Sequence, residues 1–156
     1  MKVKKLLALV LSALMAVTML AACGGGSGSG GGSSKKLVDL DKINRQVKAS
    51  VSDMTVEELP ELEKGLAAVE AMIATKNMAD IQFSDVSSLI YANINAVPHS
   101  YSSVANKFNF SGDVNTILAD LVIANEAKSS ARVFYVGAVN AKTKDGQSYL
   151  VYVTLT

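Results

Sequence analysis

The stretch Gln147-Ser-Tyr-Leu-Val-Tyr-Val-Thr-Leu155 decides the fold that this sequence predicts. β-Branched and aromatic residues dominate it, which favours a β-strand. Apolar residues occupy both of its faces: Tyr149, Val151, Val153 and Leu155 on one, Leu150 and Tyr152 on the other. A strand with one solvent-exposed face would carry polar residues in one of these two sets. We therefore expect helices on both sides of the sheet. At least one of the two tyrosines then belongs to the core.

A second β-rich run, Arg132 to Ala141, precedes this strand. The two runs are joined through Thr143-Lys144-Asp145-Gly146, and Asp-Gly in this position is typical of a β-hairpin. We therefore expect an antiparallel hairpin at the C-terminus. A third short strand is predicted around Tyr101–Ala105.

Helical periodicity accounts for most of the chain before the hairpin. Apolar residues recur at three- and four-residue steps in four segments, which are residues 37–51, 60–76, 85–95 and 113–128. Thr55 with Glu58 fits a capping box for the second helix, and Ser84 fits the N-cap of the third. The sequence thus predicts an α+β fold, a three-layer α-β-α sandwich with a small antiparallel sheet, as one domain over residues 37–156.

The N-terminal residues have the pattern of a bacterial export signal. Lys2, Lys4 and Lys5 give a positive start, and the apolar run Leu6–Leu20 is too short for a spanning helix. The run ends in Leu20-Ala21-Ala22-Cys23, which resembles the bacterial lipobox. We therefore interpret residues 1–22 as a signal peptide that is removed.

The lipobox resemblance implies that Cys23 carries a diacylglycerol and holds the protein on the outer face of the bacterial cell membrane. Several acyl chains anchor stably, because each buried methylene contributes about 0.8 kcal/mol. Residues 23–36 then form the lipidated cysteine and a tether. Its eleven Gly and Ser residues, 24–34, would reach roughly 18 Å as a flexible coil.

Composition excludes several classes of function. Removal of three of the 15 basic residues with the signal peptide would leave 12 against 14 acidic residues, a formal charge of −2. A chain without a basic excess is not expected to bind nucleic acid. His99 and Cys23 are the single histidine and cysteine, so sites that need two histidines, and a disulfide, are excluded. We expect neither a metal nor another cofactor.

The order of elements resembles a CAP domain, the SCP-like extracellular α-β-α fold of cysteine-rich secretory and pathogenesis-related proteins. The resemblance rests on short matches spread over residues 41–155. They are Ile43-Asn44, Phe83-Ser84-Asp85, the segment from His99 to Asn106, the helix 113–128, Tyr135-Val136-Gly137 and the segment from Asp145 to Tyr149.

The departures from the CAP pattern are in its cleft, which is usually lined by two histidines and acidic residues that can hold a divalent metal. Asp85 stands where the first histidine is expected, and Asn106 replaces the glutamate of Glu-Asn-Ile. The Gly-His after the long helix has no counterpart in residues 124–128. The resemblance therefore implies a vestigial cleft without a metal or a catalytic site, at Asp85, His99, Asn106 and Glu126.

Two classes of function follow. We favour a non-catalytic module that binds a protein, a cell-wall polymer or a small apolar ligand. The alternative is a hydrolase or metal-dependent enzyme with an unfamiliar site around Asp85 and His99, because an imidazole titrates near neutral pH. A loop histidine is more often polar surface, and an aspartate in a first turn more often serves the helix dipole.

Overall fold

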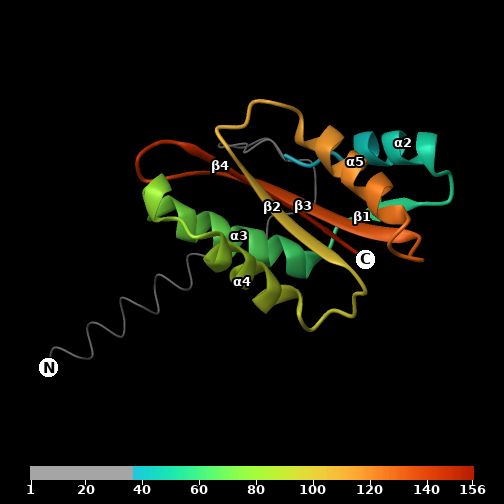
Figure 1. Ribbon diagram of the computed structural model, residues 1–156, viewed down its shortest axis with the longest axis horizontal. Helices are drawn as coiled ribbons and strands as arrows, with labels where there is room; N and C mark the ends of the chain where they lie inside the picture. The colour runs from blue at the N-terminus through green and yellow to red at the C-terminus, as the bar shows by residue number, and fades with distance from the viewer. Residues whose placement is uncertain (1–36) are drawn as a thin grey trace, which may run out of the picture. The chain divides into compact units, whose positions relative to one another are not determined.

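The computed structural model describes residues 37–156 (Figure 1). The expected signal peptide, Cys23 and the tether lie outside the described residues and stay predictions. Within the described range the chain forms an α+β fold with four α-helices, a short 3-10 turn and a four-stranded sheet. In chain order the elements are α2 (Leu40–Ser50), β1 (Thr55–Glu57), α3 (Pro60–Ala74), η1 (Met78–Asp80), α4 (Phe83–Ile94), β2 (Ser102–Phe108), α5 (Val114–Glu126), β3 (Val133–Lys142) and β4 (Ser148–Leu155).

The sheet is mixed, with the strand order β1-β3-β4-β2. β4 pairs antiparallel with β3, as the hairpin signal predicts, and also pairs antiparallel with β2. The expectation of a purely antiparallel sheet is wrong, because β1 pairs parallel with β3 in the register Thr55↔Val133. A parallel pair needs a long crossover, and here the chain between β1 and β3 supplies α3, α4, β2 and α5.

The turn between β3 and β4 confirms the predicted hairpin. Gly146 has a φ of +80°, a conformation that costs glycine little, and its N–H donates to the Thr143 carbonyl over 2.9 Å. The Asp145 carboxylate accepts from the Thr143 hydroxyl over 2.6 Å, from the Gln147 amide over 2.9 Å and from the Met78 N–H over 3.1 Å. These donors lower the pKa of Asp145 and tie the turn to the start of η1.

The hydrophobic core consists of two clusters on opposite faces of β4. Leu150 and Tyr152 pack with residues of α2 and α5, whereas Tyr149 and the residues that share its face pack with α3 and α4. Figure 1 shows the two helix pairs on opposite sides of the strands. Burial on both faces of β4 is thus confirmed, and both tyrosines are core residues.

Two glycines allow this close packing. A Cβ on Gly65 would lie 3.3 Å from the Ile90 Cα, so α3 and α4 approach most closely where α3 lacks a side chain. A Cβ on Gly137 of β3 would lie 2.6 Å from the Leu66 Cδ1. Helix α3 therefore lies directly against the sheet at this point.

The expected start of α5 is confirmed, and the caps predicted for α3 and α4 are wrong. Asp113 caps α5 by accepting from the Asn115 N–H over 3.0 Å, as its sequence position suggests. The capping box at Thr55 is wrong, because Thr55 is the first residue of β1, and α3 starts at Pro60. The Ser84 cap is also wrong. α4 starts at Phe83 with Gln82 at the N-cap, and Ser84 lies inside the helix.

The outer edge of β1 is covered by one side chain of α2. The Asn44 amide nitrogen donates to the Val56 carbonyl and its amide oxygen accepts from the Val56 N–H, both over 2.8 Å. The side-chain amide thus takes the place of a neighbouring strand. This pairing explains how a strand of only three residues is held at the sheet edge.

Candidate functional site

Asp85, the first of the four cleft positions, lies in the first turn of α4 and is exposed. Its carboxylate forms an ion pair with Lys76 over 3.0 Å. Position and partner both agree with a role at the helix terminus, where a negative charge is favourable. The ion pair joins the end of α3 to the beginning of α4.

His99 lies in the loop between α4 and β2. Its Nδ1 is 2.7 Å from the Val97 carbonyl oxygen, and a carbonyl can only accept, so Nδ1 must carry the proton. The ring is half-buried. The histidine is therefore held by its own loop.

Asn106 and Glu126 lie on opposite sides of the sheet. Asn106 of β2 is opposite Val151, so its side chain is on the face that packs against α3 and α4. Glu126 ends α5, which packs on the other face, and its carboxylate is 3.7 Å from the Arg132 guanidinium. Within residues 37–156, no hydrogen bond or ion pair joins any two of the four cleft positions.

In the part of the chain that the structure describes, no group of three or more His, Cys, Asp or Glu side chains is placed to hold a metal ion. No helix among residues 37–156 has the length and the apolar run needed to cross a bilayer.

The surface that sequence reasoning missed is the outer edge of β2. Among the described residues, β2 ends the sheet and has β4 as its only neighbouring strand. Asn109 donates to the Ser148 carbonyl and Thr156 donates to the Tyr101 carbonyl, so odd-numbered residues of this stretch bond to β4. By the alternation of an antiparallel ladder, the backbone groups of the even-numbered residues point away from the sheet. These residues are Ser102, Val104, Asn106 and Phe108.

No hydrogen bond among the described residues uses these outward backbone groups. The free edge therefore offers alternating N–H donors and carbonyl acceptors over about 20 Å, at roughly 3.3 Å per residue. We call the backbone edge formed by residues 102–108 the β2 edge.

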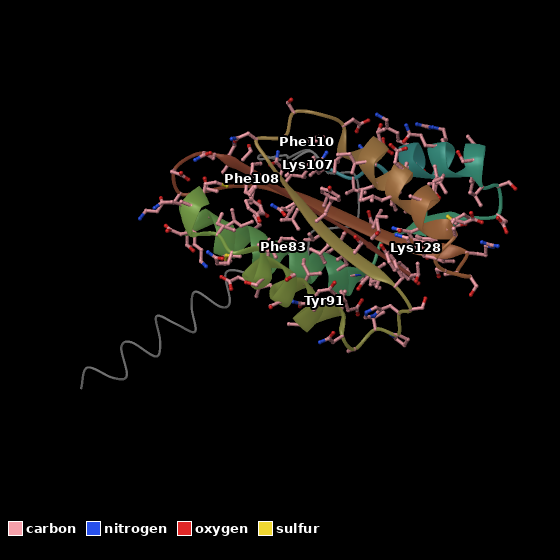
Figure 2. All side chains as sticks on the ribbon, in the orientation of Figure 1. Phe83, Tyr91, Lys107, Phe108, Phe110 and Lys128 are labelled. Atoms are coloured by element: carbon pink, nitrogen blue, oxygen red, sulfur yellow. The ribbon has the colours of Figure 1, made fainter. Side chains whose placement is uncertain are left out.

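Two lysines lie at the two ends of the β2 edge (Figure 2). The Lys107 ammonium is 5.2 Å from the centre of the Phe110 ring, and the Lys128 ammonium is 5.8 Å from the centre of the Tyr101 ring. Both lysines are exposed, and neither forms an ion pair with a carboxylate of the described residues. Each ammonium is attracted by the face of the aromatic ring near it, and no carboxylate of the described residues neutralises its charge.

Phe108 is the most exposed large apolar side chain beside this edge, at 59%. Its ring makes an edge-to-face contact with Tyr149, with the ring centres 5.2 Å apart. Phe83 at the start of α4 is also exposed, at 42%, and belongs to the helix pair on the same face of the sheet as Phe108. The β2 edge thus combines free backbone groups, two cations and an exposed aromatic ring.

Comparisons of this chain with models of protein families, with curated proteins and with solved structures found no match. Its function is therefore proposed from its own residues.

Proposed function

We propose that this chain is a membrane-anchored extracytoplasmic lipoprotein whose folded body is a non-catalytic binding module. The Leu20-Ala21-Ala22-Cys23 junction supports the anchor, because it follows a charged start and a short apolar run. The observation that carries the binding role is the free β2 edge. Natural proteins usually cover or blunt such an edge, and one that is left free is a template for another strand.

We further propose that the body has the three-layer α-β-α arrangement of a CAP domain. Its order of elements supports this, with α2 and β1 before the α3–α4 pair, then β2, α5 and the hairpin. The separation of the core into two clusters, one for each helix pair, also supports it.

The contacts of the cleft positions favour a structural role over catalysis. The carboxylates of Asp85 and Glu126 each have a cationic neighbour, and His99 Nδ1 is bound to a carbonyl of its own loop. A general base needs a reacting group within hydrogen-bond reach and a partner that orients it. A carboxylate that is held beside a lysine or arginine at a helix end serves the fold instead.

The anchor is tested with a Cys23→Ala variant in cells. We expect release from the membrane or accumulation of the unprocessed precursor, because a side chain without a thiol cannot accept the diacylglycerol. Fractionation and determination of the mature N-terminus measure this. Wild-type membrane binding with an unchanged mature N-terminus would contradict the anchor.

The non-catalytic role is tested by calorimetric titration of residues 35–156 with zinc. Zinc sites need three or four ligands, and we expect at most weak binding that His99→Ala leaves unchanged. A stoichiometric site of sub-micromolar affinity that is lost in His99→Ala would support the metal-dependent enzyme instead. Asp85→Asn then serves as the next variant.

A further inference from the structure

We propose that the β2 edge binds an extended segment of a partner protein by strand addition, and that this segment carries two carboxylates six residues apart that meet Lys107 and Lys128. The inference rests on the proposed binding function and names its surface and the chemistry of its partner.

The backbone of β2 supplies the first part of the argument. The outward N–H and carbonyl groups of Val104 and Asn106 lie in the middle of the edge, where an added strand would pair with both. Strand addition obtains its affinity from such main-chain hydrogen bonds and its specificity from alternate side chains. The edge contains no proline, and Lys107 is its one charged residue. It therefore lacks most of the features that prevent pairing.

The side chains supply the second part. Phe108 and Val104 lie on the face of α3 and α4, and Lys107 lies on the face of α2 and α5. Tyr101, under Lys128, has the same parity as Lys107, so both lysines belong to one face. A strand beside β2 would thus present apolar side chains on the first face, where they cover Phe108. On the second face it would present carboxylates near its two ends.

Charge distinguishes a foreign segment from a second copy of this chain. Two β2 edges that paired with each other would bring the lysines of both copies onto one face, and like charges across a sheet are destabilising. An acidic segment would instead neutralise Lys107 and Lys128, which have no carboxylate partner among the described residues. We therefore commit to an acidic segment.

The test uses the mature full-length lipoprotein in uncharged detergent micelles and a fluorescent peptide, acetyl-Glu-Val-Thr-Ile-Thr-Val-Glu-amide, that carries its dye on a flexible C-terminal spacer. The peptide reads the same in both directions, so it suits a parallel or an antiparallel addition. We expect saturable binding by fluorescence polarisation. Lys107→Glu and Lys128→Glu should each weaken it about threefold to tenfold, through a lost pair and a new repulsion.

Lys48→Glu is the matched control. Lys48 is exposed on α2, which covers the opposite edge of the sheet, so the same change of charge there should leave peptide binding unchanged. Equal weakening in Lys48→Glu, or unchanged binding in Lys107→Glu, would overturn the proposal. A peptide with both glutamates replaced by lysine should not bind, and equal binding of that peptide would also overturn it.

Backbone pairing is tested with two N-methylated peptides. One carries methyl groups on the amides of both valines and the isoleucine, and the other on the amides of both threonines and the last glutamate. Antiparallel addition turns the valine and isoleucine amides towards β2, and parallel addition turns the other set towards it, so a peptide that adds in one direction only should lose binding in one of the two forms. A peptide with both sets of amides methylated should not bind in either direction, and its undiminished binding would contradict strand addition. A stable dimer of the lipoprotein that excludes the parent peptide would show self-pairing and overturn the choice of partner.

These outcomes are separate from the tests of the proposed function. A lipoprotein that is anchored through Cys23 and binds no zinc, but does not bind the peptide, would keep its proposed anchor and its lack of a metal site and would lose this binding surface.

Discussion

β1 and β2 are the two edge strands of the sheet that residues 37–156 form, and each has a single neighbouring strand there. The outer backbone of β1 is bonded by the Asn44 amide, which pairs with both polar groups of Val56. The outer backbone of β2 is longer and has no partner among the described residues. A single side chain of α2 is thus enough to close one edge, and within residues 37–156 nothing closes the other. This difference is the basis of the proposal that the β2 edge binds a partner.

A pair of proline variants gives the largest expected effect. Ala105 uses its N–H towards β4, so Ala105→Pro should cost about 3 kcal/mol or more of unfolding free energy. Asn106→Pro removes an N–H that points away from the sheet and should cost about 1 kcal/mol or less. Urea unfolding measures both. Equal losses would mean that the Asn106 N–H already has a partner, and the free edge would be disproved.

Asn44→Ala removes the side-chain amide that covers the outer edge of β1. This change leaves the N–H and carbonyl of Val56 without their hydrogen bonds, so we expect a loss of about 2 kcal/mol. Lys48→Ala, at an exposed position of the same helix, is the control and should change stability by less than about 0.5 kcal/mol. Similar urea midpoints for the two variants would argue against the role given to the Asn44 amide.

Phe108→Ala removes the exposed aromatic ring of the β2 edge. The ring is mostly exposed and keeps one edge-to-face contact with Tyr149, so its removal should cost about 0.5 to 1.5 kcal/mol. The same change should reduce binding of the acidic peptide, because the added strand would cover this ring. A variant with reduced stability and undiminished peptide binding would place the partner elsewhere on the edge.

The smallest effect concerns pH and the helix that closes β1. The Lys42 side chain, followed by hydrogen bonds from Asn115 and Thr116, lowers the pKa of Asp113 from 3.8 to about 2. As the pH falls, the Asp113 carboxylate of the unfolded chain therefore takes up a proton before that of the folded chain does. The stabilisation is present above pH 3.8 and is lost as the pH falls through about 2. Urea unfolding between pH 5 and pH 2 should show a smaller acid loss for Asp113→Asn, and an identical loss would contradict this role.

Much of the fold was predictable because its signals are local. The periodicity of α2 and α5 and the Asp145-Gly146 turn each depend on residues within a few positions of one another. The double-sided burial of β4 was also predictable from the apolar residues on both of its faces. Three-residue β1 was mistaken for a capping box, because a strand that short has no period of its own.

The candidate site was not predictable by the same means. The matches to the CAP cleft selected Asp85, His99, Asn106 and Glu126, and the structure gives these residues no mutual polar contact within residues 37–156. The β2 edge depends on strand order, which is a tertiary property. Sequence alone could show a strand near Tyr101, but not that it ends the sheet or that Lys128 lies over this tyrosine.

Residue-by-residue hydrogen exchange on the full-length chain tests the difference between the two edges most directly. We expect fast exchange at the outward N–H groups of Val104 and Asn106, and slow exchange at their inward neighbour Ala105 and at Val56. The acidic peptide should slow exchange at Val104 and Asn106 while leaving Val56 unchanged. Protection of Val104 and Asn106 without any peptide, equal to that of Ala105, would show that the β2 edge is already covered and would contradict its role as a binding surface.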